Sequence, residues 1–297
     1  ASYDSFSPGP LFSPGSLEPF RMTLDEFDVL YDLANRNNIG NPIDFVATVS
    51  TEIDGQASTT DIRVNYPLEA AGANVYLTGN GFAPVITVTD GQGDISFSGP
   101  VVFLPQDSNM TSLGVIKTPD SLPEQLGLIA FFYPTAEKLT TGAYTSIYPD
   151  PISPLMTMNV YTGDLGLDSG IPRNVFALDT TNMELVAGRN GPAPAIELEV
   201  GQSAELPNGL GQVRFDGLLR FASLDIAHNP GGIWVLLFAL IALGSLALSL
   251  MVPRRRIWVR SNADGTIEFA ALSKREDPNL NVVLEDVVAE ITAEEDK

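Results

Sequence analysis

One uninterrupted apolar segment constrains this chain more than any other feature. Residues 233–252 read IWVLLFALIALGSLALSLMV and include no charged side chain. At a rise of about 1.5 Å per residue, a helix of this length spans roughly 30 Å, the thickness of the hydrocarbon core of a bilayer. A buried helix of a soluble protein normally shows a polar stripe, and this segment has none. The sequence therefore predicts one transmembrane helix over residues 233–252.

The charges next to this segment predict its orientation. Arginines at 254–256 and Arg260 follow it closely, and positive charges beside a transmembrane helix are retained on the cytoplasmic side. Trp234 and Trp258 bracket the segment, as interfacial anchors do. We therefore expect a plasma-membrane protein whose larger, preceding part lies outside the cytoplasm and whose tail lies inside it.

The start of the chain shows no translocation signal of the usual kind. Ala1 is followed by neither a basic stretch nor an apolar run, although the predicted orientation requires a large domain to cross the membrane. We therefore expect either that a signal peptide has been removed or that earlier transmembrane segments belong to the native protein. Residues 1–19 contain SFSPGPLFSPGS, which is rich in Pro, Gly and Ser and predicts an extended linker.

Composition limits what the outer part can do. The formal net charge is −21, and most of it lies before residue 230. A surface this acidic repels nucleic acid and anionic lipid headgroups. Cysteine is absent, and His228 is the only histidine. Disulfides, thiol chemistry and the usual Cys/His zinc sites are therefore excluded.

Short strands separated by turn signals run through residues 20–229. Hairpins are predicted at Asp54-Gly55, Asn80-Gly81 and Asp90-Gly91, and a further turn at Asn208-Gly209. The predicted strands cover residues 44–52, 59–64, 74–77, 85–88, 94–97, 196–200, 213–215 and 218–226. This pattern predicts a mainly β fold: an extracytoplasmic β-sandwich or open barrel, followed by one transmembrane helix and a small hairpin-plus-helix cytoplasmic tail.

Two stretches of this domain have alternative interpretations. Residues 20–32 combine a helix-capping pattern with the alternation of a strand, and we favour the strand. Residues 126–133, LGLIAFFY, form either a buried strand, which we favour, or a patch that faces the membrane or a partner.

Residues 253–297 predict a small folded tail. Strands at 257–259 and 266–270 flank Asp264-Gly265, and Asp277 is placed to cap a helix. The apolar residues of this helix lie on one face: Leu280, Val283, Leu284, Val287, Val288 and Ile291. That face packs on the hairpin or on another protein. We favour a partner, because so small a tail buries such a face poorly by itself.

Most patterns with catalytic or metal-binding chemistry are missing or weak. The chain contains no GxxxxGK, GxSxG or HExxH motif. The segment 90–94, DGQGD, does not have the spacing of a calcium loop, and we interpret it as a turn. Glu197 and Glu199 occupy the solvent side of a half-buried strand. A Ser-His-Asp triad would need His228, but Asp225 lies three residues away and points to the opposite face of a strand.

His228 is the one candidate site residue. It continues the apolar strand face of Leu224 and Ile226 and precedes Asn-Pro-Gly-Gly and the predicted transmembrane helix. Two roles are open for it. One is an interfacial residue whose polar atoms bind water or a headgroup. The other is a ligand or proton carrier at the outer rim of the bilayer.

Several long sequences resemble the actinobacterial branch of the ResB (CcsB) family. They are TLDEFDVLYD, IRVNYPLEAAGANVYLTGNGFAPVITVTD, FSGPVVFLPQDSNMTSLGVIKTPD, PEQLGLIAFFYPTA, YTGDLGLDSG and LPNGLGQVRFDGLLRFASLDIAHNPG, followed by the apolar segment and its arginines. The resemblance covers almost the whole chain from Leu17. ResB-like proteins are membrane subunits of the System II cytochrome c maturation machinery. The family implies three further transmembrane helices ahead of the outer domain.

The resemblance also implies partners and a cofactor. It implies that the chain acts with CcsA (ResC) to pass haem across the membrane and join it to apocytochrome c. The joining chemistry is usually ascribed to a tryptophan-rich loop of CcsA, and this chain has no such segment, so we expect an accessory subunit. The family's histidine before the last helix matches His228, which implies contact with a haem held mainly by the partner. The alternative is a non-catalytic structural or receptor subunit of a membrane respiratory assembly.

Overall fold

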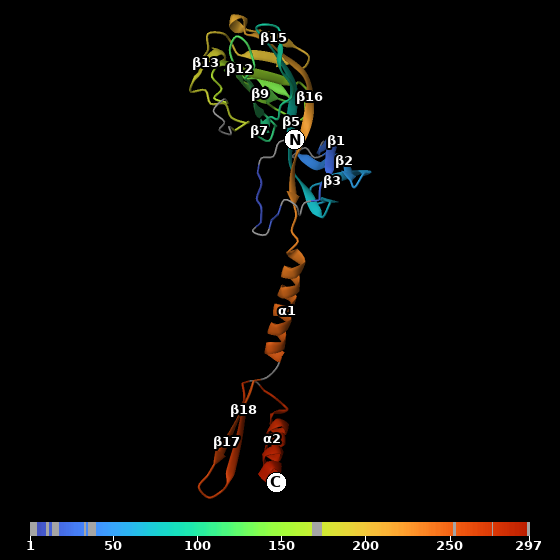
Figure 1. The fold of residues 1–297 in the computed structure, drawn as a ribbon, viewed down its shortest axis with the longest axis vertical. Helices are drawn as coiled ribbons and strands as arrows, with labels where there is room; N and C mark the ends of the chain where they lie inside the picture. Colours follow the sequence, from blue (N-terminus) through green and yellow to red (C-terminus); the bar gives the residue numbers. More distant parts are fainter. Residues whose placement is uncertain are drawn as a thin grey trace. The chain divides into compact units, whose positions relative to one another are not determined.

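The computed structural model describes residues 5–9, 12–13, 18–32, 34, 40–167, 174–251, 254–274 and 276–295 (Figure 1). The chain forms two compact units, residues 1–228 and residues 229–297. Strands account for 52% and helices for 13% of the structure, which confirms the predicted mainly β class. Part of the predicted linker, residues 1–4, 10–11 and 14–17, lies outside the described residues. The rest of it contains neither helix nor strand.

The first three strands form a small antiparallel sheet. They are β1 (Arg21–Tyr31), β2 (Pro42–Ile53) and β3 (Gln56–Arg63), in the order β1-β2-β3. Asp54 and Gly55 have φ values of 50° and 77°, and positive φ at both central residues is the condition for a type I′ turn. The predicted hairpin at this position is therefore confirmed, and so is the favoured strand in residues 20–32.

Two long strands, β5 (Ala73–Asp90) and β16 (Gly211–Ala227), pair antiparallel along nearly their whole length. The predicted hairpin at Asn80-Gly81 is wrong, because both residues lie inside β5. Gly81 pairs with Phe221, and a Cβ at this glycine would overlap the Phe221 ring. The glycine therefore permits a close approach between two strands, a role that looks like a turn signal in the sequence.

The two predicted strands at 213–215 and 218–226 also join, because β16 continues through a bulge between Phe215 and Gly217. The predicted turn at Asn208-Gly209 is present as a 3-10 turn, Pro207–Gly209. The hairpin at Asp90-Gly91 is confirmed as the connection from β5 to β6.

Two larger sheets pack into a β-sandwich. One has the order β15-β16-β5-β4 with β6 beside β5, and the other has the order β13-β12-β9-β8-β7 with β14 beside β12. The two sheets face each other across one core, as in the predicted sandwich, and an antiparallel bridge between Phe82 of β5 and Phe103 joins them at one edge, as in the alternative open barrel. The remaining strands are β4 (Leu68–Ala70), β6 (Ile95–Pro100), β7 (Leu104–Pro105), β8 (Ser112–Thr118), β9 (Leu126–Tyr133), β10 (Ala136–Lys138), β11 (Tyr144–Ser146), β12 (Leu155–Gly163), β13 (Met183–Ala187), β14 (Ile196–Glu199) and β15 (Ser203–Leu206).

Two apolar cores lie along the β5–β16 ribbon. The first fills the sandwich, where the Phe82 and Phe132 ring centroids are 5.1 Å apart. Strand β9, the predicted LGLIAFFY strand, is part of this core, so its interpretation as a buried strand is confirmed. The second core joins the other half of the ribbon, through Val75 and Leu77, to the three-stranded sheet. The segment predicted as one domain, residues 20–229, thus contains two cores on one ribbon.

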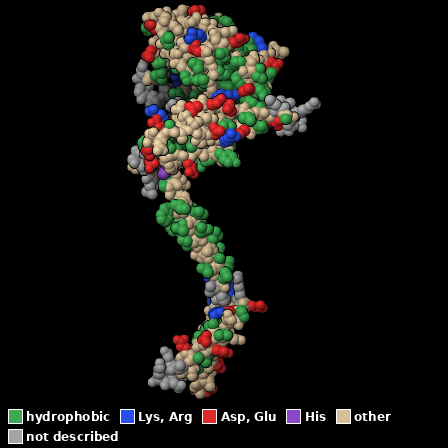
Figure 2. Space-filling view, turned by 90° about the vertical axis from the view of Figure 1, so that its right-hand side faces the viewer, with side chains coloured by type: hydrophobic (Ala, Val, Ile, Leu, Met, Phe, Trp, Pro, Cys, Tyr) green, Lys and Arg blue, Asp and Glu red, His purple; other side chains and the backbone are tan. Residues whose placement is uncertain are grey.

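The second unit begins with α1 (Gly232–Met251), which is long and apolar enough to cross a bilayer. Its mean hydropathy is 2.5, and none of its length is buried. Figure 2 shows hydrophobic side chains along this helix. The last residue of the predicted span, Val252, lies outside the described residues, as does Pro253.

The tail forms the predicted hairpin and helix: β17 (Arg255–Ser261), β18 (Ile267–Ser273) and α2 (Leu280–Glu295). Helix α2 packs against β18, and the apolar residues of its predicted face are half-buried. Arg255 Nη2 lies 3.2 Å from Asp277 Oδ1, and this ion pair lowers the pKa of Asp277. The structure thus shows this face packed on the hairpin, which is the alternative that the sequence analysis did not favour.

Candidate ligand site at His228

A tight turn places a backbone carbonyl beside His228. Strands β4 and β5 form a hairpin whose last cross-strand pair is Ala70 with Ala73. Ala71 and Gly72 are therefore the two turn residues. Their φ values are 48° and 70°, again a type I′ turn, and glycine adopts this region without steric cost. His228 follows β16 directly, where Ala227 pairs with Asn74 of β5. The turn and the end of β16 therefore lie together.

One hydrogen bond determines which imidazole nitrogen carries the proton. His228 Nδ1 lies 2.7 Å from the carbonyl oxygen of Gly72. A carbonyl oxygen only accepts, so Nδ1 donates the hydrogen. In a neutral imidazole the other nitrogen, Nε2, then has an unshared electron pair. The side chain is exposed, and within the described ranges no residue hydrogen-bonds Nε2.

Bonds of this kind are common around metal-binding histidines. A backbone carbonyl that accepts from one ring nitrogen fixes the tautomer and the ring orientation, and it makes the other nitrogen more basic. Next to His228, Ile226 pairs with Val75, which is fully buried in the second core. Ile226 itself is 47% exposed. The imidazole therefore stands at the edge of an apolar core, and no described residue bonds its Nε2.

The structure does not assemble a hydrolytic triad at His228. The acceptor for Nδ1 is a carbonyl rather than a carboxylate. Asp225 pairs with Tyr76, and strand alternation directs its side chain away from the face of His228. Asp225 instead lines a shallow hollow of about 530 Å³ with Val64, Asn65, Tyr76, Leu77 and Thr78. The sequence-based exclusion of a triad agrees with this geometry.

Asp90, which begins the segment DGQGD, braces a turn. Its Oδ1 accepts hydrogen bonds from the backbone N–H groups of Gln92 at 2.9 Å and Asp94 at 3.0 Å. Its Oδ2 accepts one from Leu122 N at 3.0 Å. Burial alone would raise the pKa of Asp90, but these N–H groups outweigh it and lower the pKa below its ordinary value. Both oxygens are thus committed to the backbone, as expected for a turn.

Glu197 and Glu199 lie on the exposed side of β14, as predicted. Glu197 Oε2 accepts a hydrogen bond of 2.7 Å from the Tyr144 hydroxyl, and its Oε1 lies 3.7 Å from Lys138 Nζ. The Lys138 ammonium also lies 4.9 Å from the centroid of the Tyr144 ring. These contacts attach the β10–β11 hairpin to the sandwich and place the Glu197 carboxylate in a surface network, while Glu199 Oε2 lies 3.4 Å from Gln202 Nε2.

Arg220 is a largely buried charge that the sequence analysis did not single out. Its side chain is only 16% exposed. Nη2 lies 2.8 Å from Asp150 Oδ1 and 3.5 Å from the Tyr31 hydroxyl, and Cζ lies 4.5 Å from the centroid of the Phe82 ring. Arg220 therefore ties β1, the Asp150 loop and the ribbon together between the two cores. Its signal in the sequence is an arginine with apolar neighbours on both sides, in LLRFA.

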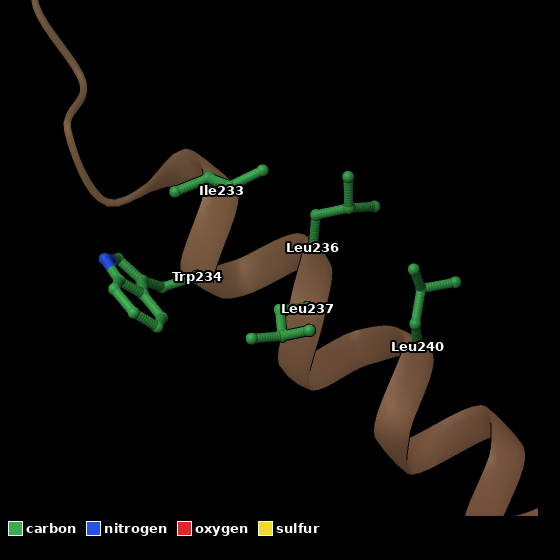
Figure 3. Close-up of a pocket in the computed structure, with 5 residues that line it drawn as sticks. All are labelled: Ile233, Trp234, Leu236, Leu237 and Leu240. Carbon is green, nitrogen blue, oxygen red and sulfur yellow. The ribbon is translucent and has the colours of Figure 1, made fainter.

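The described residues offer one candidate axial ligand for haem iron, and they do not form a complete haem site. Within the described part of the chain, no group of three or more His, Asp or Glu side chains is placed to hold a metal ion. Neutral imidazole is a common axial ligand of haem iron, and His228 offers one through Nε2. A second hollow, about 350 Å³, is lined only by apolar residues of α1 (Figure 3): Ile233, Trp234, Leu236, Leu237 and Leu240. This flank of a single helix suits acyl chains rather than a polar ligand.

The fold and the site define a membrane-associated protein with a β-sandwich and a single tautomer-fixed histidine just before its apolar helix in the sequence. The chain belongs to the ResB-like family, whose family model matches residues 1–285. The resemblance found in the sequence is thereby confirmed. Membership indicates a membrane-associated role in cytochrome c biogenesis. Comparison with curated proteins and with solved structures gave no match.

Proposed function

We propose that this chain acts in cytochrome c maturation with a CcsA/ResC-like membrane protein, in the delivery of haem across the membrane and its attachment to apocytochrome c. His228 binds the haem through Nε2. The observation that carries this proposal is the hydrogen bond from His228 Nδ1 to Gly72 O. It orients the ring and reserves Nε2 for a ligand, as a backbone carbonyl does at many metal-binding histidines.

The same hydrogen bond favours one of two possible haem contacts. A neutral imidazole whose Nδ1 carries the proton has only an acceptor at Nε2, which suits an iron atom and not a haem propionate. A propionate contact at Nε2 would require the imidazolium form. The bound haem supplies the group that is attached to apocytochrome c. His228 supplies one nitrogen ligand. Residues 1–297 hold no other histidine and no cysteine, so the second ligand comes from outside this segment.

We further propose that residues 1–229 are extracytoplasmic and that residues 253–297 are cytoplasmic. The support is the cluster of arginines at 254–256 together with Arg260, immediately after α1. In this orientation His228 lies on the side of the membrane where apocytochrome c receives its haem. The acidic outer unit also suits a cationic partner and disfavours nucleic acid.

Two substitutions separate ligation from anchoring of the turn. His228→Ala removes both the hydrogen bond to Gly72 and the Nε2 ligand. His228→Asn retains a side-chain N–H donor for the Gly72 carbonyl but lacks the imidazole ligand. We expect both variants of the full-length protein to lower the yield of holocytochrome c by at least about tenfold, because a lost axial ligand is not replaced by either side chain. Haem staining of cytochrome c in producing cells measures this yield.

Rescue and complex assembly distinguish the alternatives. Free imidazole should partly restore the haem spectrum of the purified His228→Ala complex, and the complex itself should co-purify with its CcsA-like partner as the wild type does. If His228→Asn has a normal yield of holocytochrome c and His228→Ala does not, the role of His228 is only to hold the β4–β5 turn through its hydrogen bond. A normal yield in both variants, with no haem absorbance in the complex, would favour the structural or receptor subunit instead.

A further inference from the structure

The tail hairpin has one face that no described residue covers. Neighbouring residues of a strand alternate between faces, and the register pairs Arg256 with Leu272, Trp258 with Ala270 and Arg260 with Glu268. All members of the resulting outer hairpin face are exposed: Arg256, Trp258, Arg260, Glu268, Ala270 and Leu272. Trp258 is 48% and Leu272 59% exposed. Two large apolar side chains therefore face solvent among charged ones.

The opposite face of the hairpin is partly covered by α2. Ile257, Phe269 and Ala271 lie on that face and are half-buried, and α2 packs against β18. The exposed side of α2 is acidic, with Glu285, Asp286 and Glu290. Helix α2 thus covers only one face of the hairpin. Packing within the tail leaves the apolar side chains of the outer hairpin face exposed.

Positive charge concentrates at the open end of the hairpin. Arg254 precedes β17, Arg256 lies near its start, and Lys274 follows β18; all three are exposed. The only acidic residue of the outer hairpin face, Glu268, pairs with Arg260 toward the turn. The exposed Glu276 follows Lys274 at this end and offsets only part of this charge, so the open end, where Trp258 and Leu272 also lie, has an excess of positive charge.

The chain connection keeps this end near the bilayer. Strand β17 begins at Arg255, shortly after α1 ends at Met251, and the connecting residues reach at most about 14 Å when fully extended. The open end of the hairpin thus stays within reach of the headgroups at that end of α1. Arginine forms paired hydrogen bonds with phosphate, and tryptophan prefers the membrane interface.

We propose that the outer hairpin face docks on anionic phospholipid headgroups of the membrane that α1 crosses. Arg254, Arg256 and Lys274 bind lipid phosphates, while Trp258 and Leu272 enter the interface between them. The acidic side of α2 is left in water, where a negatively charged surface does not oppose docking. This docking does not depend on the haem function of the other unit, and each is tested separately.

Trp258 fluorescence in lipid nanodiscs tests the proposal on the full chain. The substitution Trp234→Phe leaves Trp258 as the only tryptophan, since the chain has two. Discs of phosphatidylcholine are compared with discs that contain about one third phosphatidylglycerol. We expect a blue-shifted emission and strong quenching by lipids brominated near the headgroup in the anionic discs, and weak quenching in the zwitterionic discs. High salt should reduce the quenching, because the contacts are electrostatic.

A charge-matched pair of variants tests the face itself. Arg256→Gln with Lys274→Gln removes two charges from the open end, and the docked fraction should fall, with the docking equilibrium constant reduced roughly fivefold for each charge. Arg189→Gln with Arg214→Gln removes the same charge from exposed positions of the other unit and should leave the quenching unchanged. Equal quenching in both lipid compositions, equal effects of the two double variants, or a Trp258 spectrum typical of water in every disc would each overturn the proposal.

Discussion

At the scale of single residues, Asp90 and His228 show how backbone groups select the chemistry of a side chain. The Asp90 carboxylate accepts three backbone N–H bonds, which favour its charged form and fix it within the turn. The His228 imidazole donates one bond to a carbonyl and keeps its second nitrogen open. Residue type alone suggests a metal ligand at both positions, but the Asp90 oxygens are already bonded to backbone N–H groups, whereas His228 Nε2 has no hydrogen-bond partner among the described residues.

The depressed pKa of Asp90 makes a prediction about acid stability. A carboxylate whose pKa is lower in the folded state stabilises the fold above its unfolded-state pKa, about 3.9, and this contribution is lost as the pH falls through the folded value. Asp90→Asn should therefore lower the urea midpoint at neutral pH, and the gap to the wild type should narrow below about pH 4. Far-ultraviolet circular dichroism measures the midpoints. Asp120→Asn, at an exposed position, is the control.

A gap between Asp90→Asn and the wild type that stays constant down to about pH 3 would contradict a charge-dependent role for the Asp90 carboxylate. The stability lost in Asp90→Asn would then come from altered hydrogen-bond geometry alone and not from the lost charge.

Sequence reasoning reached His228 because it is the only histidine and precedes the apolar helix, but it did not reach the partner of its ring. Gly72 lies 156 positions earlier in the chain, and only the pairing of β5 with β16 brings the two together. Arg220 was missed for a related reason. Its partners Asp150, Tyr31 and Phe82 come from distant segments, so the sequence around the arginine does not identify them.

At the scale of elements, the β5–β16 ribbon is the feature that local sequence patterns predict least well. Asp54-Gly55 and Asp264-Gly265 behave as predicted, because a short hairpin is determined by its own turn residues. Asn80-Gly81 has equally strong turn chemistry but lies within an 18-residue strand. There, pairing with a partner strand far away in the sequence overrides the local preference.

The ribbon makes a prediction about its glycines. Gly81→Ala places a Cβ against the Phe221 ring and near the Phe103 carbonyl, and overpacking of this kind costs about 1–3 kcal/mol of unfolding free energy. Gly217→Ala, on the partner strand, adds a methyl group where no atom lies within 4 Å, so we expect a change within about 0.5 kcal/mol. Urea unfolding at an unchanged m-value measures both. Equal midpoints for the two variants would mean that Gly81 occupies a turn, as its sequence suggests, and not the strand.

At the scale of the whole molecule, residues 1–228 combine two cores through one ribbon and a largely buried arginine. The sandwich core takes one half of β5 and β16, and the three-stranded sheet covers the other half. Neither half of the ribbon is complete without its own partner sheet, because one face of each would be exposed. The candidate ligand site lies at the end of the half that belongs to the second core, so its geometry depends on the three-stranded sheet as well as on the β4–β5 turn.

The orientation across the membrane is the last prediction, and it bears on the function directly. The proposed part in haem attachment outside the cytoplasm requires the unit that ends at His228 to be outside as well. Because the arginines after α1 oppose translocation of the tail, protease added to intact spheroplasts should digest residues 1–229 and spare the tail, detected through an epitope at its end. Detergent-treated spheroplasts, where both parts are accessible, give the control. Protection of the larger unit in intact spheroplasts would place His228 in the cytoplasm and would remove it from the site of attachment, even if its imidazole binds haem.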